Sequence, residues 1–203
     1  MLASIPAELL RALRLTLVVA AVTGVIYPLA ITGLAQGLFP GQANGSLVTE
    51  NGRVVGSALI GQEFTSPRYF HGRPSATVNA TTGRPQPYAA DNSGGSNLGP
   101  SNPALIERVA KEVQATRQQD HLPPDATIPV DLVTTDFSGL DPDISEASAL
   151  LQVTRVARAR HLDPAKVRSL VEDHVHGRML GVFGEPYVNV LELNLALDRG
   201  EAG

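Results

Sequence analysis

A run of small polar residues, Asn92–Pro103 (NSGGSNLGPSNP), contains the residue types that bind phosphate in many proteins. Glycine-rich loops that open onto a helix bind phosphate through backbone N–H groups and the helix dipole, and a helical pattern begins at Pro103. A nucleotide loop of the G-x-x-x-x-G-K-[ST] type also needs a lysine, and the first lysine of the chain is Lys111. The G-x-G-x-x-G spacing does not fit either. The run is more typical of a turn-rich connection, or of a shaped surface whose glycines supply backbone angles that other residues resist.

Histidines and carboxylates offer two weaker candidates for metal binding. His174 and His176 are close in sequence, but positions i and i+2 of a helix point to different faces and make a poor metal pair. The segment DFSGLDPDIS holds Asp136, Asp141 and Asp143 but lacks the D-x-[DN]-x-[DN]-G order of a calcium loop. Turn formation and helix capping account for these carboxylates more simply, so no metal site is predicted.

Nucleophilic chemistry has little support in the sequence. No serine lies in G-x-S-x-G, and the absence of cysteine excludes a cysteine nucleophile, thiolate zinc sites and disulfides. No acid–base pair stands out. The net charge of -4 also argues against nucleic acid as a partner, because neutralising phosphates requires a basic face.

Three helices are predicted after the glycine-rich run, in the segments 102–119, 143–161 and 163–177. Each repeats apolar residues at helical spacing and starts with a capping signal. These signals are Asn102 before Pro103, Asp143 with Glu146 as a capping box, and Asp163 before Pro164. Gly177 is suited to end the third helix.

Strands are predicted around these helices. Asn51-Gly52 lies between two β-prone runs and predicts a tight hairpin. Two further strands are predicted over 128–134 (IPVDLVT) and 187–197 (YVNVLELNLAL), the second because its leucines alternate with other residues. Between the hairpin and the first helix, the aromatic residues Tyr69, Phe70 and Tyr88 interrupt a turn-rich segment, which indicates that part of it packs. The fold class expected is α+β.

An uncharged apolar run precedes this domain. No charged side chain occurs from Leu15 to Phe39, and about 20 apolar residues are enough to cross a bilayer as a helix. A buried core helix of this length without a polar face would be unusual in so small a domain, and a cleaved signal peptide has a shorter apolar region. We therefore expect a retained transmembrane helix, kinked near Tyr27 by Pro28.

The flanking charges predict the orientation of this helix. Arg11 and Arg14 precede the run, and the first charge after it is Glu50. By the positive-inside rule, the N-terminus is expected in the cytoplasm and the remainder outside. The expected organisation is a cytoplasmic N-terminus (1–14), a transmembrane helix and its exit (15–39), and an extracytoplasmic domain (40–203).

The chain resembles the KdpC family, the C subunits of the Kdp-type potassium-transporting P-type ATPases. The motifs that carry the resemblance run from about Tyr27 to Asp198: YP in the membrane run, QANGSL, GSALIGQEF, YFHGRPSA, SGGSNLGPSNP, DLVT, SGLDPDIS, RVARAR and VNVLELNLALD. The segment TTDF before SGLDPDIS and the length of Thr77–Asn92 depart from the family pattern. These departures concern loops and leave the expected fold unchanged.

The resemblance implies a single-span accessory subunit of a bacterial inner-membrane complex. Its partners would be a channel-like potassium-binding subunit and a P-type ATPase subunit, which handle potassium and ATP, so no cofactor of its own is expected. It also implies a catalytic-chaperone role that raises the ATP affinity of the pump subunit, with Gln152 and the loop residues Ser93, Gly94 and Gly95 related to nucleotide. The predicted orientation opposes such a role, because it places these residues away from cytosolic ATP. The alternatives are a membrane-anchored extracytoplasmic enzyme and a lone ion-binding protein.

Overall fold

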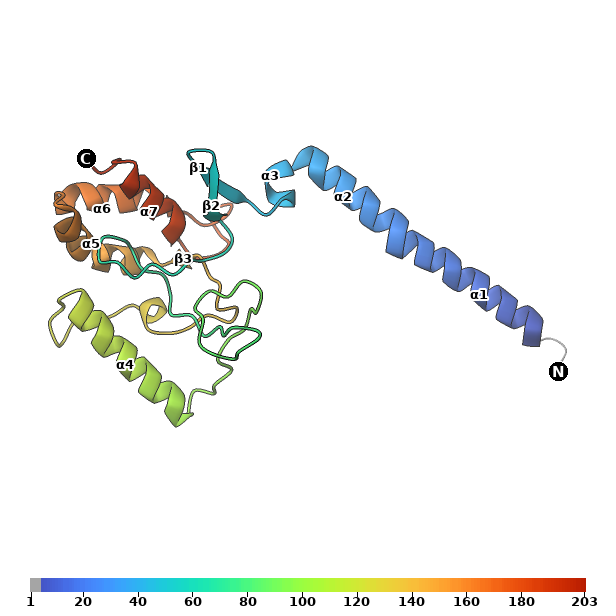
Figure 1. The fold of residues 1–203 in the computed structure, drawn as a ribbon, viewed down its shortest axis with the longest axis horizontal. Helices are drawn as coiled ribbons and strands as arrows, with labels where there is room; N and C mark the ends of the chain where they lie inside the picture. The colour runs from blue at the N-terminus through green and yellow to red at the C-terminus, as the bar shows by residue number, and fades with distance from the viewer. Residues whose placement is uncertain (1–4) are drawn as a thin grey trace. The chain divides into compact units, whose positions relative to one another are not determined.

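A computed structural model of the protein describes residues 5–203 and divides the chain into two compact units. The first unit ends at Leu47 and the second comprises Val48–Gly203. Figure 1 shows a long helix in the first unit and a mixture of helices and short strands in the second. The predicted α+β class, with one N-terminal apolar helix, is confirmed.

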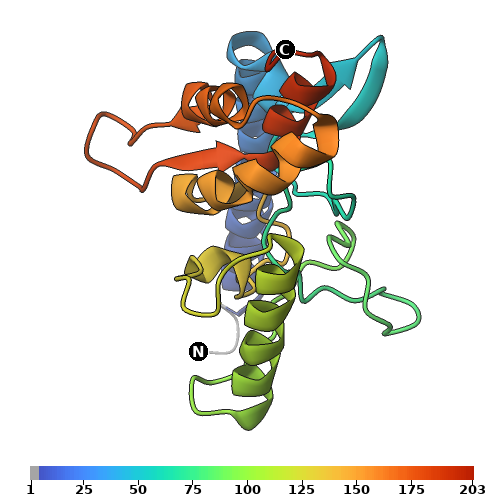
Figure 2. The ribbon, with the colours of Figure 1, turned by 90° about the vertical axis from the view of Figure 1, so that its left-hand side faces the viewer.

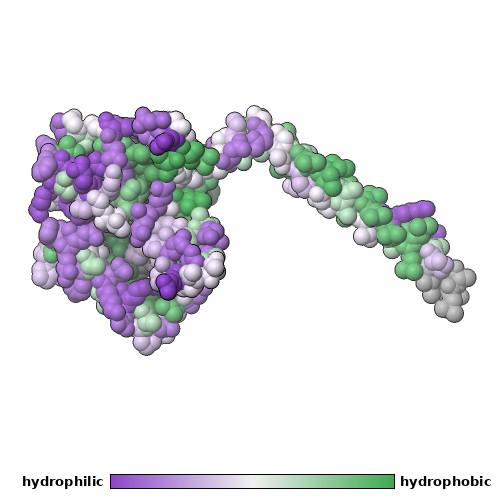
Figure 3. Space-filling view, in the orientation of Figure 1, coloured by the Kyte–Doolittle hydropathy of each residue, from purple (hydrophilic) through white to green (hydrophobic). Residues whose placement is uncertain are grey.

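The helix of the first unit is long and apolar enough to cross a membrane over Pro6–Leu38, which is 33 residues. Its side chains are exposed, and Figure 3 shows hydrophobic residues over most of its length. The N-terminal polar end carries an ion pair between Arg11 and Glu8. The unit consists of α1 (Ile5–Ala21), a π-helical turn η2 (Val22–Ile26), α2 (Tyr27–Leu38) and the short α3 (Pro40–Ala43).

The π-helical turn ends at Ile26, two residues before Pro28. A proline in a helix clashes with the carbonyl of the residue four positions earlier, and a wider turn relieves this clash. Here the Tyr27 N–H donates to the Val22 carbonyl, five residues back. The irregularity expected near Tyr27 therefore takes the form of a π turn.

The predicted hairpin is present at the start of the second unit. Strands β1 (Leu47–Glu50) and β2 (Arg53–Ser57) are joined by Asn51 and Gly52. Both turn residues have positive φ, 50° and 76°, as a type I′ turn requires. Arg199 forms an ion pair with Glu50 at 2.6 Å and ties the hairpin to the end of the chain.

The core of the second unit lies between three helices and a small sheet. Figures 1 and 2 show α5, α6 and α7 together, with α4 apart from them. Buried side chains such as Val156, Val171, Val188 and Leu193 fill the interior. The elements are α4 (Pro103–Gln119), α5 (Glu146–Arg160), α6 (Pro164–Asp173), α7 (Val190–Asp198), and β3 (Asp143–Ile144), β5 (Tyr187–Asn189) and β4 (Val175–His176) in antiparallel order β3-β5-β4.

The strand predicted over 187–197 is wrong beyond Asn189. Asn189 ends β5 and caps α7, its side-chain oxygen accepting from the Glu192 N–H at 3.2 Å. The alternating leucines coincide with a helical pattern in which Val190, Leu193 and Leu197 are all buried. Tertiary packing of this helical face decides the structure of the segment.

Three smaller predictions are also wrong. The segment 128–134 forms no strand but a 3₁₀ turn, η3 (Val130–Leu132), after Pro129. Ser145, not Asp143, caps α5, accepting from the Ser148 N–H, while Asp143 pairs with Asn189 in the sheet. Helix α6 ends at Asp173, well before Gly177. The caps predicted for the other two helices, at Asn102 and Asp163, are confirmed.

Candidate functional site

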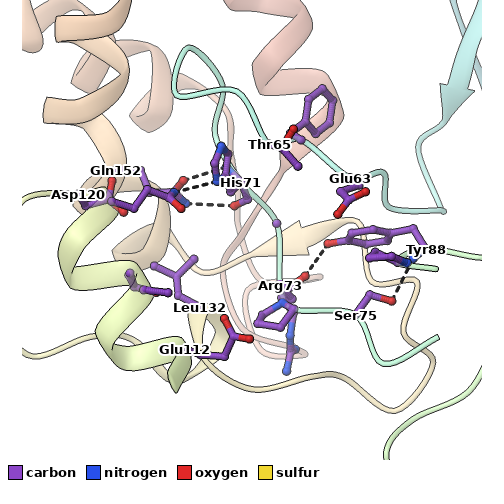
Figure 4. A pocket seen from close by; sticks show the side chains of 17 residues that line it. Glu63, Thr65, His71, Arg73, Ser75, Tyr88, Glu112, Asp120, Leu132 and Gln152 are labelled. Atoms are coloured by element: carbon purple, nitrogen blue, oxygen red, sulfur yellow. Dashed lines mark hydrogen bonds between the residues drawn. The ribbon is translucent and has the colours of Figure 1, made fainter. Parts of the chain in front are cut away.

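A cavity of about 370 Å³ lies in the second unit, where α4 faces the turn-rich segment 63–75. Figure 4 shows its walls, which include Glu63, His71, Arg73, Tyr88 and Gln152. The cavity mixes apolar surface with charged and amide groups. Hydrogen bonds between residues that are far apart in sequence hold the walls of the cavity together.

Two buried side-chain amides hold the turn-rich segment in place. Asn194 accepts from the Phe70 N–H at 2.8 Å and donates to the Phe70 carbonyl at 2.9 Å. Gln152 does the same for the next residue, accepting from the His71 N–H at 2.8 Å and donating to the His71 carbonyl at 3.1 Å. Each amide therefore replaces a neighbouring strand, which satisfies the buried backbone groups of a segment that has no strand beside it.

Arg155 connects these two amides, Asn194 and Gln152, which we call the amide clamp, to the end of α4. Its guanidinium donates to Asp120 at 2.8 Å, to the carbonyls of Pro67 and Tyr69 at 2.8 Å each, and to Gln152 Oε1 at 2.5 Å. Arg155 and Asp120 are both buried. Because a guanidinium can only donate, its contact fixes the Gln152 oxygen on this side. The amide of Gln152 is thus occupied on both its oxygen and its nitrogen by the protein itself.

His71 is held as a neutral ring in the cavity wall. Its Nε2 lies 2.9 Å from the Ser66 carbonyl and must donate, so Nδ1, 2.8 Å from the Gln119 amide nitrogen, accepts. Burial lowers the pKa of His71, and the positive charge of Arg155 acts in the same direction. The ring therefore serves as a bridge between α4 and the turn-rich segment rather than as a charged group.

Tyr88 closes the other end of the cavity. Its hydroxyl donates to the Arg73 carbonyl at 2.7 Å, and burial raises the pKa of its phenol. The ring lies against Gly61 and Gly72, where a Cβ would come within 2.4 Å and 2.5 Å of Tyr88 atoms. The packing predicted from the aromatic residues of this segment is confirmed. It also explains why two glycines are needed beneath the ring.

Two hydroxyls of the cavity, those of Ser75 and Tyr88, donate to carbonyl oxygens. Ser75 Oγ donates to the Gly139 carbonyl at 2.7 Å and accepts from the Tyr88 N–H at 3.0 Å. Neither Ser75 nor Tyr88 is aimed at a base that could activate it. In the region that the structure describes, no cluster of three or more histidine or acidic side chains is arranged to hold a metal ion. The cavity can accommodate a small molecule, but the polar groups of His71, Ser75, Tyr88 and Gln152 are engaged by the protein itself.

Ser93, Gly94 and Gly95 do not line this cavity. They lie against the loop 136–139, where the Gly94 N–H donates to the Ser138 carbonyl at 2.8 Å and Ser93 Oγ donates to the same oxygen at 3.1 Å. The structure therefore places Gln152 in the cavity wall and the three loop residues at a different contact. The Gly94 N–H is already engaged, which removes it as a donor for phosphate.

The reason for glycine in this loop differs from the one predicted. Neither Gly94 nor Gly95 has a positive φ, so unusual backbone angles are not the requirement. A Cβ on Gly95 would lie 2.9 Å from the Phe137 carbonyl oxygen, whereas one on Gly94 would meet no atom within 4 Å. Close approach of two backbone segments is what demands glycine, and it does so only at position 95.

Sequence reasoning missed most of the clamp. The sequence predicts a strand around Asn194 and a helix around Arg155, and although both lie in family-like motifs, VNVLELNLALD and RVARAR, no contact is predicted for either. The motif YFHGRPSA does contain Phe70 and His71, and a polar residue among the leucines of α7 was the available signal for Asn194. Partners 81 and 124 residues apart have no local pattern that would identify them.

The architecture defines a class of protein: an α+β unit held together by the hydrogen bonds of buried polar side chains, preceded by one helix that could span a membrane. A family model described as K+-transporting ATPase, c chain (KdpC) matches residues 9–199. Curated relatives called potassium-transporting ATPase KdpC subunit are similar over nearly their whole length. That of Bradyrhizobium diazoefficiens is 54% identical over 200 residues, covering 96% of this chain and 98% of the relative.

Two further relatives agree with this match. The subunit of Methylobacterium nodulans is 56% identical over 200 residues, covering 94% of this chain and 98% of the relative. That of Sorangium cellulosum is 58% identical over 194 residues, covering 95% and 97%. The chain belongs to the KdpC family of potassium-transporting ATPase subunits.

Proposed function

We propose that the protein is an accessory subunit of an ATP-driven, high-affinity potassium import complex in the bacterial inner membrane. Its partners would be a channel-like potassium-binding subunit and a P-type ATPase subunit, which handle potassium and ATP, while this chain needs no cofactor of its own. The observation that carries the proposal is the family match over 9–199, which includes both the apolar helix and the second unit.

The proposed arrangement places residues 1–14 in the cytoplasm, 15–39 in the membrane and 40–203 outside. Arg11 and Arg14 support it, because basic residues at one end of a spanning helix stay on the cytoplasmic side. The helix over Pro6–Leu38 has the length required.

A role through protein contacts has further support on the surface of the second unit. Phe137 is 90% exposed and lies beside a groove lined by Leu59, Ile60 and Pro142. Exposed apolar patches of this kind mark interaction sites. We propose that this surface supports assembly of the complex.

The resemblance also implies a catalytic-chaperone role, and the contacts of Gln152 bear on how that role would act. Gln152 is buried and its amide is fully used by His71 and Arg155, so binding a nucleotide there would first break the clamp. We therefore propose that any rise in the ATP affinity of the pump subunit acts through protein contacts. Direct nucleotide binding at Gln152 or at Ser93–Gly95 is the less favoured form.

Co-purification tests the proposed membership. The full-length chain, tagged at its C-terminus, is extracted from native membranes in mild detergent. We expect a potassium-binding channel-like subunit and a P-type ATPase subunit to accompany it, identified by mass spectrometry. Recovery of the chain alone, from membranes in which both other subunits are detected, would contradict the proposal.

Protease accessibility tests the proposed orientation. Protease added to spheroplasts should digest the second unit, because residues beyond 40 are proposed to lie outside. Inverted vesicles should protect it. The opposite pattern would contradict the proposed orientation and favour a direct nucleotide role. Either result leaves the proposed membership of the complex unaffected.

A further inference from the structure

An apolar hairpin, Arg178–Glu185 (RMLGVFGE), protrudes from the second unit between β4 and β5. Figure 2 shows the loop in orange-red, extending away from the neighbouring helices. Met179 and Phe183 form an antiparallel bridge, with Leu180, Gly181 and Val182 in the turn between them. All four of its large apolar side chains are exposed, from 61% at Phe183 to 85% at Leu180.

The apolar hairpin is ordered by its own contacts. The Met179 N–H donates to the Phe183 carbonyl at 2.9 Å, and the Phe183 N–H returns a bond to Met179 at 3.0 Å. At the neck, Arg178 and Glu185 form an ion pair at 2.7 Å. Since the backbone is already fixed, burying the tip costs little conformational entropy.

The distribution of polar and apolar residues on the apolar hairpin indicates which kind of surface the hairpin contacts. Bridge partners lie opposite each other on one face of a hairpin, and the turn residues Leu180 and Val182 add apolar surface beyond them. A flat protein surface would cover only one side of such a tip, whereas a fluid apolar medium surrounds it. The tip from Met179 to Gly184 carries no charged side chain, and the two charges at the neck, Arg178 and Glu185, neutralise each other.

We propose that the apolar hairpin inserts into the lipid surface of the membrane that holds the helix of the same chain. The inference rests on the proposed membrane anchoring. Only nine residues separate Leu38, the end of α2, from Val48, the start of the second unit. At most about 35 Å of extended chain can therefore lie between them, which keeps the second unit that carries the hairpin close to the bilayer.

Tryptophan fluorescence tests the proposal, because the chain contains no tryptophan. Phe183→Trp provides one reporter in the full-length protein, reconstituted into vesicles of phosphatidylcholine and phosphatidylglycerol with or without brominated acyl chains. We expect bromolipid to quench most of its fluorescence and its emission to shift to the blue. Adding Leu180→Asp is expected to abolish both effects while the far-ultraviolet circular dichroism is unchanged.

Two matched reporters separate the possible results. Leu17→Trp lies in α1 and should be quenched if the helix is in the bilayer, whereas Phe137→Trp, on the exposed surface of the second unit, should not. If Leu17→Trp is quenched but Phe183→Trp is quenched no more than Phe137→Trp, the helix is in the bilayer and the hairpin is not. This outcome would overturn the hairpin proposal alone. A blue shift of Phe183→Trp only when other subunits are added would make the hairpin a protein contact instead. An unquenched Leu17→Trp would overturn the anchoring and, with it, the insertion.

Discussion

Arg155→Leu is expected to destabilise the second unit by about 3–5 kcal/mol, the usual cost of removing one partner of a buried ion pair. The substitution leaves the Asp120 carboxylate buried without its cation and removes the donors for the Pro67 and Tyr69 carbonyls. The measurement is urea-induced unfolding of the full-length protein in detergent, followed by circular dichroism.

Arg199→Leu is the matched control for this change. It removes the same kind of side chain from an ion pair with Glu50 that lies on the surface. Water and salt screen such pairs, so the unfolding midpoint is expected to change little. Equal destabilisation by the two substitutions would mean that the buried network does not hold α4 and α5 together as described.

Gln152→Leu is the second change with a large expected effect. It leaves the His71 N–H and carbonyl without partners, and an unsatisfied buried polar group costs about 1–3 kcal/mol each. We expect a lower unfolding midpoint together with a loss of complex yield. The apparent KM for ATP of complexes that do assemble should be unchanged, because no nucleotide contact is removed.

The opposite result would favour the nucleotide role of this residue. A Gln152→Leu protein of normal stability, in a complex with a raised KM for ATP, would contradict the structural role. Ser93→Ala provides a control at the other family-implied position, since it removes a single hydroxyl contact to Ser138. The Arg155 and Gln152 substitutions share a hydrogen bond, so their combined effect should fall short of additivity.

Local signals predicted the elements that depend on local chemistry. Asn102 and Asp163 cap their helices because each side chain reaches an N–H two residues ahead, and Asn51-Gly52 turns the chain because both residues tolerate positive φ. The strand predicted over 187–197 stops at Asn189 because α7 is buried on most of its faces, so leucines at every second position stay in the core of a helix as they would in a strand.

The candidate site was less predictable than the fold. Gln152 could be singled out through the family resemblance, but its bonds to His71 depend on the path of the whole chain. Asn194 and Arg155 act on backbone groups, which any residue provides, so no sequence motif marks their partners. The role of Gly95 depends likewise on the distance to the Phe137 carbonyl, which no spacing in the sequence reveals.

The amide clamp on Phe70 and His71 has a consequence for biosynthesis. Asn194 follows Phe70 by 124 residues, so the ribosome adds it on the order of ten seconds later. Until then the backbone groups of Phe70 lack their partner, and the turn-rich segment cannot settle. A nascent chain stalled before α7 would therefore expose this segment to proteases and chaperones, and the second unit must complete its folding only after its last helix has been made.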